Sequence, residues 1–162
     1  MRLTAVTILL ATLALAMTPS TGRAQAPVPY GPPISIENAK RAAAPAIAEA
    51  RRNNWMMAVA IVDPAGDLVY FERMDNTQTA SVNIAQDKAR SAAMFKRPTK
   101  AMQDVVAGGG DGLRFLALRG ATPVEGGIPL MMEGKIVGAI GVSGGTSQQD
   151  AQCASAGVAV LK

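Results

Sequence analysis

The chain has 162 residues, of which 49% are hydrophobic, with a single cysteine, no histidine and a formal net charge of +4. The lack of histidine excludes imidazole ligands for metals and every histidine-dependent catalytic triad. One cysteine cannot form an intrachain disulfide. The 16 lysines and arginines are scattered, with few aromatic residues between them. The sequence therefore lacks the basic, aromatic-rich surface expected of a nucleic-acid-binding protein.

Residues 1–26 have the pattern of a secretory signal peptide. Arg2 supplies the positive start, residues 5–17 are apolar, and Ala24 and Ala26 form a small-x-small cleavage site. We therefore expect a periplasmic or secreted protein without a membrane span after cleavage; the alternative is a retained N-terminal anchor. The apolar run is shorter than the about 20 residues that cross a bilayer, and no later run is longer. Cleavage would leave 136 residues with a formal charge of +2, which is enough for one domain.

The first half of the remaining chain predicts a helix, a hairpin and two more helices. Residues 27–34 hold four prolines and predict an extended lead-in to a domain at 35–162. Apolar residues then recur at helical spacing to Arg52, with Pro45 bending the helix and Ser35 capping it. Two strands follow, separated by the turn sequence DPAGD. Predicted next are a helix around residues 82–92, closed by Pro98, a short helix at 99–106 and a mobile loop at 107–112.

The last third repeats the hairpin and adds a terminal helix. GIPLMM and KIVGAIGVS read as strands joined by Glu133 and Gly134, and apolar residues at helical spacing follow. The order helix, hairpin, helix, irregular segment, hairpin, helix favours a single α+β domain, an antiparallel sheet with packed helices, over a doubly wound parallel sheet.

The stretch GAIGVSGGTSQQD, residues 138–150, has two interpretations. Backbone amides between Gly141 and Gly145 could converge on a carboxylate or phosphate at a helix start. Alternatively, the glycines only turn the corner, and Ser147 with Asp150 forms a capping box that satisfies the helix amides. The spacing alone favours the corner, because it lacks the GxGxxG fingerprint of a dinucleotide site.

Charged residues form a second candidate site. In ERMDN, residues 72–76, a strand ends in two acids and an arginine. Arg73 could bind the carboxylate of a ligand while Glu72 or Asp75 holds the Arg73 side chain in place. Alternatively, these residues only form an internal ion pair at the strand end. Lys88 borders the buried face of its predicted helix. Its ammonium could reach a ligand or Asp75, or could reach solvent with no function.

Nucleophiles are present without activating partners. Cys153 falls among alanines on the terminal helix, so we expect an inert packed thiol. Of the nine methionines, Met94, Met131 and Met132 are among those that could ligate a haem iron, and the sequence selects none of them.

The segments AIVDPAGDLVYFERMD, IAQDKARSAAMF, GGIPL and GAIGVSGG, followed by Asp150, resemble the GlcG/HbpS-type haem-binding family, which includes the C-terminal domain of PduO-type cobalamin adenosyltransferases. The resemblance extends from about residue 35 to the end of the chain. It implies a profilin-like fold, homo-oligomers, and haem or a small anionic molecule as ligand. Exported relatives are expected to work with a sensor or transport partner. The recurrent family positions imply ligand-binding roles for Asp63, Arg73, Met74, Asp75, Lys88, Gly126, Gly127, Ser143, Gly144 and Asp150.

One departure separates this sequence from the family pattern. Where the family often has histidine after the hairpin glycine, this chain has Asp67, so haem cannot be held through imidazole. Its iron would need an oxygen, thioether, thiolate or amine donor, or the propionates and apolar faces would hold the porphyrin. We expect a non-enzymatic binding protein without a metal ion of its own. The alternatives are an enzyme acting on a small organic acid or aldehyde with Lys88 as base or amine, and a structural or sensory partner without ligand.

Overall fold

The computed structural model describes residues 28–161. Helix α1 (Ile36–Arg52) starts after Ser35, whose hydroxyl accepts a hydrogen bond from the amide of Asn38 at 3.3 Å. Pro45 lies inside the helix, and the predicted end at Arg52 is confirmed. Most of its buried residues are alanines, so the helix can approach the sheet closely.

Four antiparallel strands form one sheet in the order β2-β1-β4-β3. Both predicted hairpins are present, and β1 pairs with β4 in the centre, where Ala60 lies opposite Gly141. All five residues of β1 are buried, which confirms its predicted interior position. The strands are Ala58–Val62 (β1), Leu68–Arg73 (β2), Gly127–Met132 (β3) and Lys135–Ser143 (β4).

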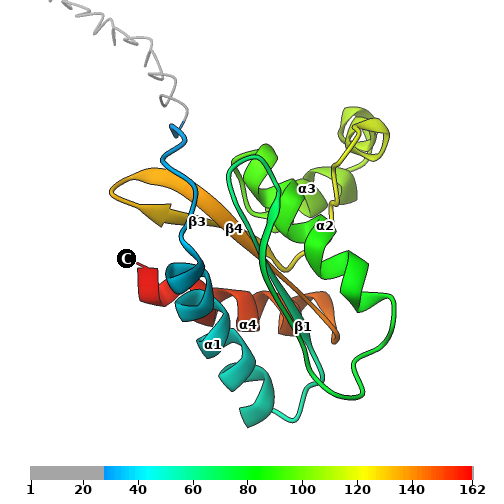
Figure 1. The fold of residues 1–162 in the computed structure, drawn as a ribbon. Coiled ribbons are helices and arrows are strands. Elements are labelled where there is room, and N and C mark those ends of the chain that lie inside the picture. The colour runs from blue at the N-terminus through cyan, green and yellow to red at the C-terminus, as the bar shows by residue number, and fades with distance from the viewer. Residues whose placement is uncertain (1–27, 162) are drawn as a thin grey trace, which may run out of the picture.

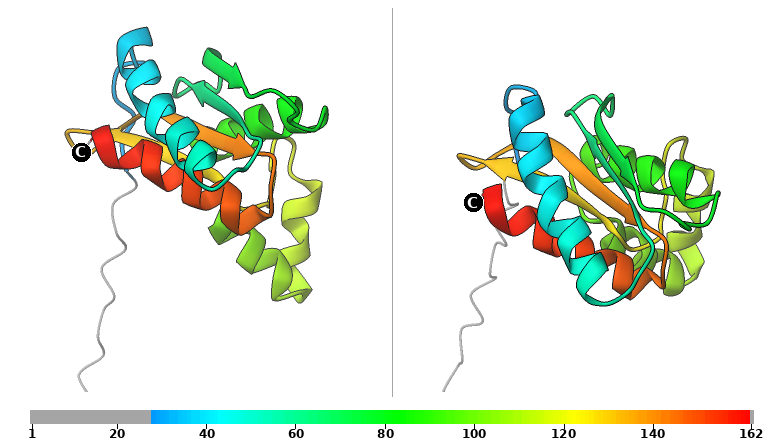
Figure 2. Two further views of the ribbon diagram at one scale, coloured as in Figure 1. Left: turned by 90° about the horizontal axis from the view of Figure 1, so that it is seen from below. Right: turned by 60° about the horizontal axis from the view of Figure 1, so that its bottom comes forward.

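Helices cover both faces of this sheet (Figure 1). Helix α2 (Ser81–Met94) packs on one face, and Figure 2 shows α1 and α4 (Ser147–Val158) together on the other. Because neighbouring strand residues point to opposite faces, Val59 contributes to the core under α1 and α4, and Ala60 to the core under α2. The predicted α+β domain with an antiparallel sheet is confirmed, in agreement with a profilin-like arrangement.

Glycines in β4 allow close backbone contacts, and Gly141 lets α2 lie directly on the sheet. A Cβ atom added at Gly141 would lie 2.0 Å from the carbonyl oxygen of Ala85 and 2.5 Å from the amide nitrogen of Ala89, both in α2. A Cβ at Gly138 would lie 2.2 Å from the carbonyl oxygen of Val62. The glycine-rich character of GAIGV therefore follows from close backbone packing.

The segment after α2 differs in part from its prediction. Helix α3 (Thr99–Ala107) confirms the short helix. The predicted loop at 107–112 is wrong in its second half, because a 3-10 helix, η1 (Gly110–Ala117), begins there. Gly109 and Gly110 have φ values of 69° and 54°, which turn the chain between the two helices. A second 3-10 helix, η2 (Ala159–Leu161), follows α4.

The proline-rich lead-in runs along the end of β4. The amide of Gly31 donates to the carbonyl of Ile136 at 2.8 Å, and the amide of Ile136 donates to the carbonyl of Pro29 at 3.0 Å. The predicted signal peptide, residues 1–26, lies outside the described residues. Between residues 28 and 161, no helix combines the length and apolar character needed to span a bilayer.

The contact at Gly141 can be tested by Gly141→Ala. The added methyl group must push α2 away from the sheet, so we expect a loss of about 3 kcal/mol in the free energy of unfolding, measured by urea denaturation. Gly108→Ala is the control, because its Cβ would meet only ordinary contacts, the nearest at 3.4 Å. Equal denaturation midpoints for the two variants would contradict the close packing.

Candidate functional site

The ten residues predicted to bind ligand do not form one site. Six of them lie in or against a buried cluster between α2, β4 and α4: Lys88, Gly126, Gly127, Ser143, Gly144 and Asp150. Three others, Arg73, Met74 and Asp75, line an open pocket at the end of β2. Asp63 belongs to neither group.

A buried ion pair organises the first group. Lys88 Nζ lies 2.6 Å from Asp150 Oδ2, with side-chain exposures of only 1% and 4%, and it also donates to the carbonyl of Val142 at 3.1 Å. The prediction that Lys88 reaches solvent is wrong, because its ammonium finds both acceptors inside the core. The charge of Lys88 is thus balanced within the chain, and its acidic partner is Asp150 rather than Asp75.

Opposing influences act on the pKa of the Asp150 carboxyl. Burial raises this pKa above its ordinary value, whereas the Lys88 ammonium and the backbone amides of Gly145 and Gly144 lower it; the Gly145 amide donates to Oδ1 at 3.0 Å. The burial effect is the largest. Burial also raises the pKa of the Cys153 thiol to about 11, with a further contribution from the charge of Asp150. Fully buried Cys153 is therefore an unreactive thiol, as its sequence context predicted.

The glycine pair of GGIPL wraps over this ion pair. Gly126 has a φ of 126°, and a Cβ there would lie 2.9 Å from Lys88 Nζ. A Cβ at Gly127 would lie 2.3 Å from the carbonyl oxygen of Lys88, and the Gly127 amide donates to Thr99 Oγ1 at 2.9 Å. These glycines seal the ion pair from solvent, which accounts for their place in the sequence without a ligand.

The corner after β4 satisfies its own polar groups. The capping box consists of Thr146 and Gln149, so the predicted box of Ser147 and Asp150 is wrong by one residue. Gly144 carries a φ of 156°, and a Cβ there would lie 2.2 Å from the carbonyl oxygen of Met56. The hydroxyls of Ser143 and Ser81 lie 3.2 Å apart. Because the amides of 145, 146 and 149 all have partners within the chain, the geometry favours the corner over an anion-binding wall.

Asp63 closes the β1–β2 hairpin. Its Oδ1 accepts hydrogen bonds from the amides of Ala65 and Asp67, both at 2.9 Å. Gly66, between these residues, has a φ of 90°. Asp63 therefore has a turn-forming role, in which an Asp side chain replaces a backbone acceptor.

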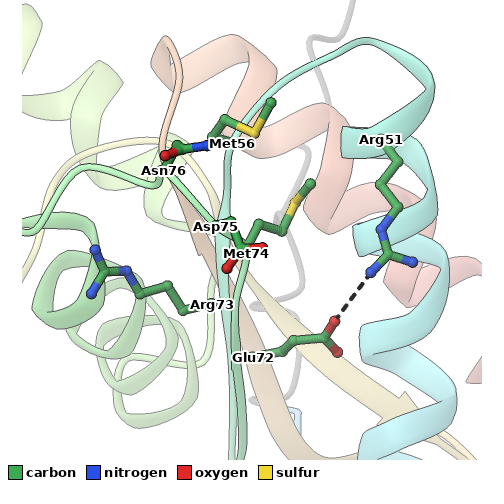
Figure 3. Close-up of a pocket in the computed structure, with 7 residues that line it drawn as sticks. All are labelled: Arg51, Met56, Glu72, Arg73, Met74, Asp75 and Asn76. Carbon is green, nitrogen blue, oxygen red and sulfur yellow. Dashed lines mark ion pairs between the residues drawn. The ribbon is translucent and has the colours of Figure 1, made fainter.

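The second group lines an open pocket of about 400 Å³ beside the end of edge strand β2 (Figure 3). The pocket also takes Arg51 from the last turn of α1 and Met56 from the segment before β1. Because two arginines and two methionines distinguish it, we call it the arginine–methionine pocket. Its lining residues are Arg51, Met56, Glu72, Arg73, Met74, Asp75 and Asn76.

The two arginines of this pocket have partners within the chain but keep unused hydrogen-bond donors. Arg51 lies 3.8 Å from Glu72, and both side chains remain accessible, at 68% and 34%. Arg73 points away from that pair (Figure 3) and donates to the carbonyl of Thr77 at 2.9 Å. Each guanidinium has five N–H donors, so both retain donors for an anion.

Sequence reasoning found most of this pocket. ERMDN, which supplies five of its seven lining residues, was recognised from its charge at a strand end, whereas Arg51 and Met56 were missed. Arg51 looked like an ordinary basic residue in the last turn of a helix, and Met56 like the first residue of a buried strand. Packing of α1 beside β2 brings Arg51 to Glu72, and the pairing of β1 with β2 brings the segment of Met56 to the end of β2 at Arg73.

The buried ion pair can be tested with Lys88→Met. This variant leaves the Asp150 carboxylate without its partner, so we expect a loss of about 3–5 kcal/mol in the free energy of unfolding. Adding Asp150→Leu should recover part of that loss, because no charge then remains buried. Lys100→Met is the control, since it breaks an exposed pair with Asp104 and should leave the midpoint unchanged. A stable single variant would contradict this account.

Comparisons with known proteins agree with the fold and the motifs. The chain is 40% identical over 95 residues to the protein GlcG of Escherichia coli K12, which is 59% of this chain and 69% of GlcG. It resembles a crystal structure of a double mutant of the Streptomyces reticuli protein HbpS with a TM-score of 0.74 and 27% identity, over 98% of this chain and 99% of that one.

A third relative carries haem. The chain resembles the crystal structure of a PduOC:heme complex with a TM-score of 0.72 and 27% identity, over 80% of this chain and 96% of that one. The family model "Haem degrading protein HbpS-like" matches residues 34–159. The resemblance to GlcG, HbpS and PduO predicted from the motifs is therefore confirmed, and this chain belongs to the HbpS-like family.

Proposed function

We propose that this protein is an exported haem-binding protein and that the arginine–methionine pocket receives the porphyrin. The family model and the haem complex of a structural relative support a haem-related role. The observation that carries the proposal for this chain is the joint placement of two guanidinium groups and two thioethers around one open pocket.

The chemistry of the pocket fits haem in two respects. Arg51 and Arg73 lie on different sides of it and can each hold a propionate through a charge-assisted hydrogen bond. The methionine side chains offer flexible, polarisable contacts for a flat aromatic ring. A pocket of about 400 Å³ is within the size range of small-molecule sites, and its open side leaves room for a ligand that protrudes. Bound haem would supply redox and oxygen chemistry, and the side chains would position it.

The enzyme alternative receives less support from the geometry. A base or Schiff-base amine must reach its substrate, but the Lys88 side chain is 1% exposed and paired with Asp150. Lys88 is also absent from the lining of the arginine–methionine pocket. We therefore propose binding, rather than chemistry at Lys88, as the function of this chain.

Export and assembly remain predictions that other features support. Residues 1–26 carry the signal-peptide pattern, which favours the periplasm or the exterior. Exposed apolar side chains on and around α3 and η1 favour a homo-oligomer, because such a patch is unusual on an isolated domain. A sensor or transport partner stays an expectation from the family resemblance. The exposed apolar residues are Val105, Leu113, Leu116, Leu118 and Val124.

The haem proposal predicts a saturable change in the Soret band when hemin is added to the purified mature protein. Binding should reach one haem per arginine–methionine pocket, measured by absorption titration against a buffer blank. Serum albumin in excess can serve as a competitor, because a specific complex should survive dilution into it longer than loosely adsorbed hemin. A linear, unsaturable absorbance increase would refute the proposal.

The propionate contacts predict the effect of Arg73→Ala. Loss of one charge-assisted hydrogen bond should weaken hemin binding about tenfold, measured as Kd at low and high salt. Arg97→Ala is the matched control: it also removes one exposed arginine side chain, which donates to the nearby carbonyl of Phe95 and lies outside the pocket. Equal affinities for the two variants would remove Arg73 from the site.

A further inference from the structure

We propose that Met74 supplies a thioether ligand to the haem iron in the arginine–methionine pocket. This inference rests on the proposed haem-binding function and adds the identity of the iron ligand. It depends on which donor atoms the fold buries and which it presents to the pocket.

The groups that would coordinate haem iron most strongly are either missing from the sequence or buried. The sequence contains no histidine. Cys153, the only thiol, is completely buried, and a Cys153 thiolate is disfavoured in that position. The Lys88 amine is buried in its ion pair with Asp150. Thiolate, imidazole and the Lys88 amine are therefore excluded as iron ligands in this fold.

The two tyrosines are also poorly placed. The Tyr30 hydroxyl donates to the carbonyl of Ala93 at 2.9 Å, at the C-terminal end of α2 and outside the pocket. The Tyr70 hydroxyl donates to Glu72 Oε2 at 2.9 Å, and this hydrogen bond raises the pKa of the phenol. A phenolate ligand would have to give up that bond and ionise beside a carboxylate.

Most methionines of the described chain lie elsewhere. Met57 and Met102 are fully buried. Met94 packs against Gly66 at the hairpin turn, and Met132 lines a separate pocket beside Pro32 and Pro33. Within residues 28–161, the thioethers that line the arginine–methionine pocket are those of Met56 and Met74.

Met74 is the better anchored of these two. Its amide donates to the carbonyl of Met57 at 3.0 Å, and its carbonyl accepts from the buried Thr77 hydroxyl at 2.8 Å. Its side chain packs partly against the core, whereas Met56 is 40% exposed. In Figure 3, Met74 lies between the two arginines. A ligand atom on such a fixed backbone loses less conformational entropy on binding.

A thioether donor has a measurable consequence for the iron. Sulfur of this kind is a soft ligand that favours the ferrous over the ferric state and raises the reduction potential. Carboxylates are hard ligands, so coordination by Asp75 or Glu72 would have the opposite effect. The identity of the ligand can therefore be read from the complex itself.

The test compares hemin complexes of the wild type, Met74→Leu and Met56→Leu. Both substitutions nearly conserve volume, and circular dichroism melts would verify that each variant is folded. The readouts are the sulfur-to-iron charge-transfer band in near-infrared magnetic circular dichroism and the midpoint potential. We expect Met74→Leu to lose the band and to shift the potential downward, while Met56→Leu, the matched control, keeps both.

The outcomes separate this inference from the haem proposal. Saturable hemin binding without a sulfur band in the wild type would overturn Met74 as ligand and leave haem binding intact. Persistence of the band in Met74→Leu would likewise overturn it. Loss of the band in both variants would show that it reports the shape of the pocket, which also overturns the assignment. Failure of the wild type to bind hemin at all would refute the haem proposal itself.

Discussion

The ion pair between Lys88 and Asp150 is the interaction on which the rest of the structure depends. A lysine and an aspartate in a core of small apolar residues are costly to desolvate, and only their mutual contact with further hydrogen bonds offsets that cost. The pair joins α2 to α4 through the end of β4, so both helix layers are fixed to the same strand. The glycines at 126 and 127 are a requirement of the same pair, since any side chain there would meet Lys88.

Two groups of charged residues in this fold have different structural roles. The buried charges of Lys88 and Asp150 neutralise each other, whereas the charges at the open end of β2 are held only by exposed or single contacts. Residues that resemble a family motif can thus be essential for different reasons. Lys88 and Asp150 hold the layers together, whereas Arg73 and its neighbours on the edge strand are free to meet a ligand.

The sequence predicted the fold better than the site. Apolar patterns together with turn and capping residues placed α1, α2 and both hairpins, because these signals lie within each element or directly beside it. Lys88 was placed on the buried side of its helix, but its partner could not be identified, since Asp150 lies 62 positions away and looked like a capping residue. The same limit hid Arg51 and Met56, which reach the pocket through the packing of α1 and the pairing of β1 with β2. For the glycines after β4 the spacing favoured a corner, whereas the family resemblance implied ligand-binding roles for Gly126, Gly127 and Gly144. Close backbone packing leaves no periodic signal that would explain these glycines from sequence.

The one-residue shift of the capping box has a consequence for how this chain can vary. Thr146 and Gln149 begin helix α4, and Asp150, one position later, turns inward to Lys88. The first turn of α4 therefore meets two separate requirements: one face caps the helix, and the other pairs with Lys88. An insertion or deletion between 146 and 150 would rotate the acid away from the lysine even if the helix still started normally. The length of this turn is therefore fixed.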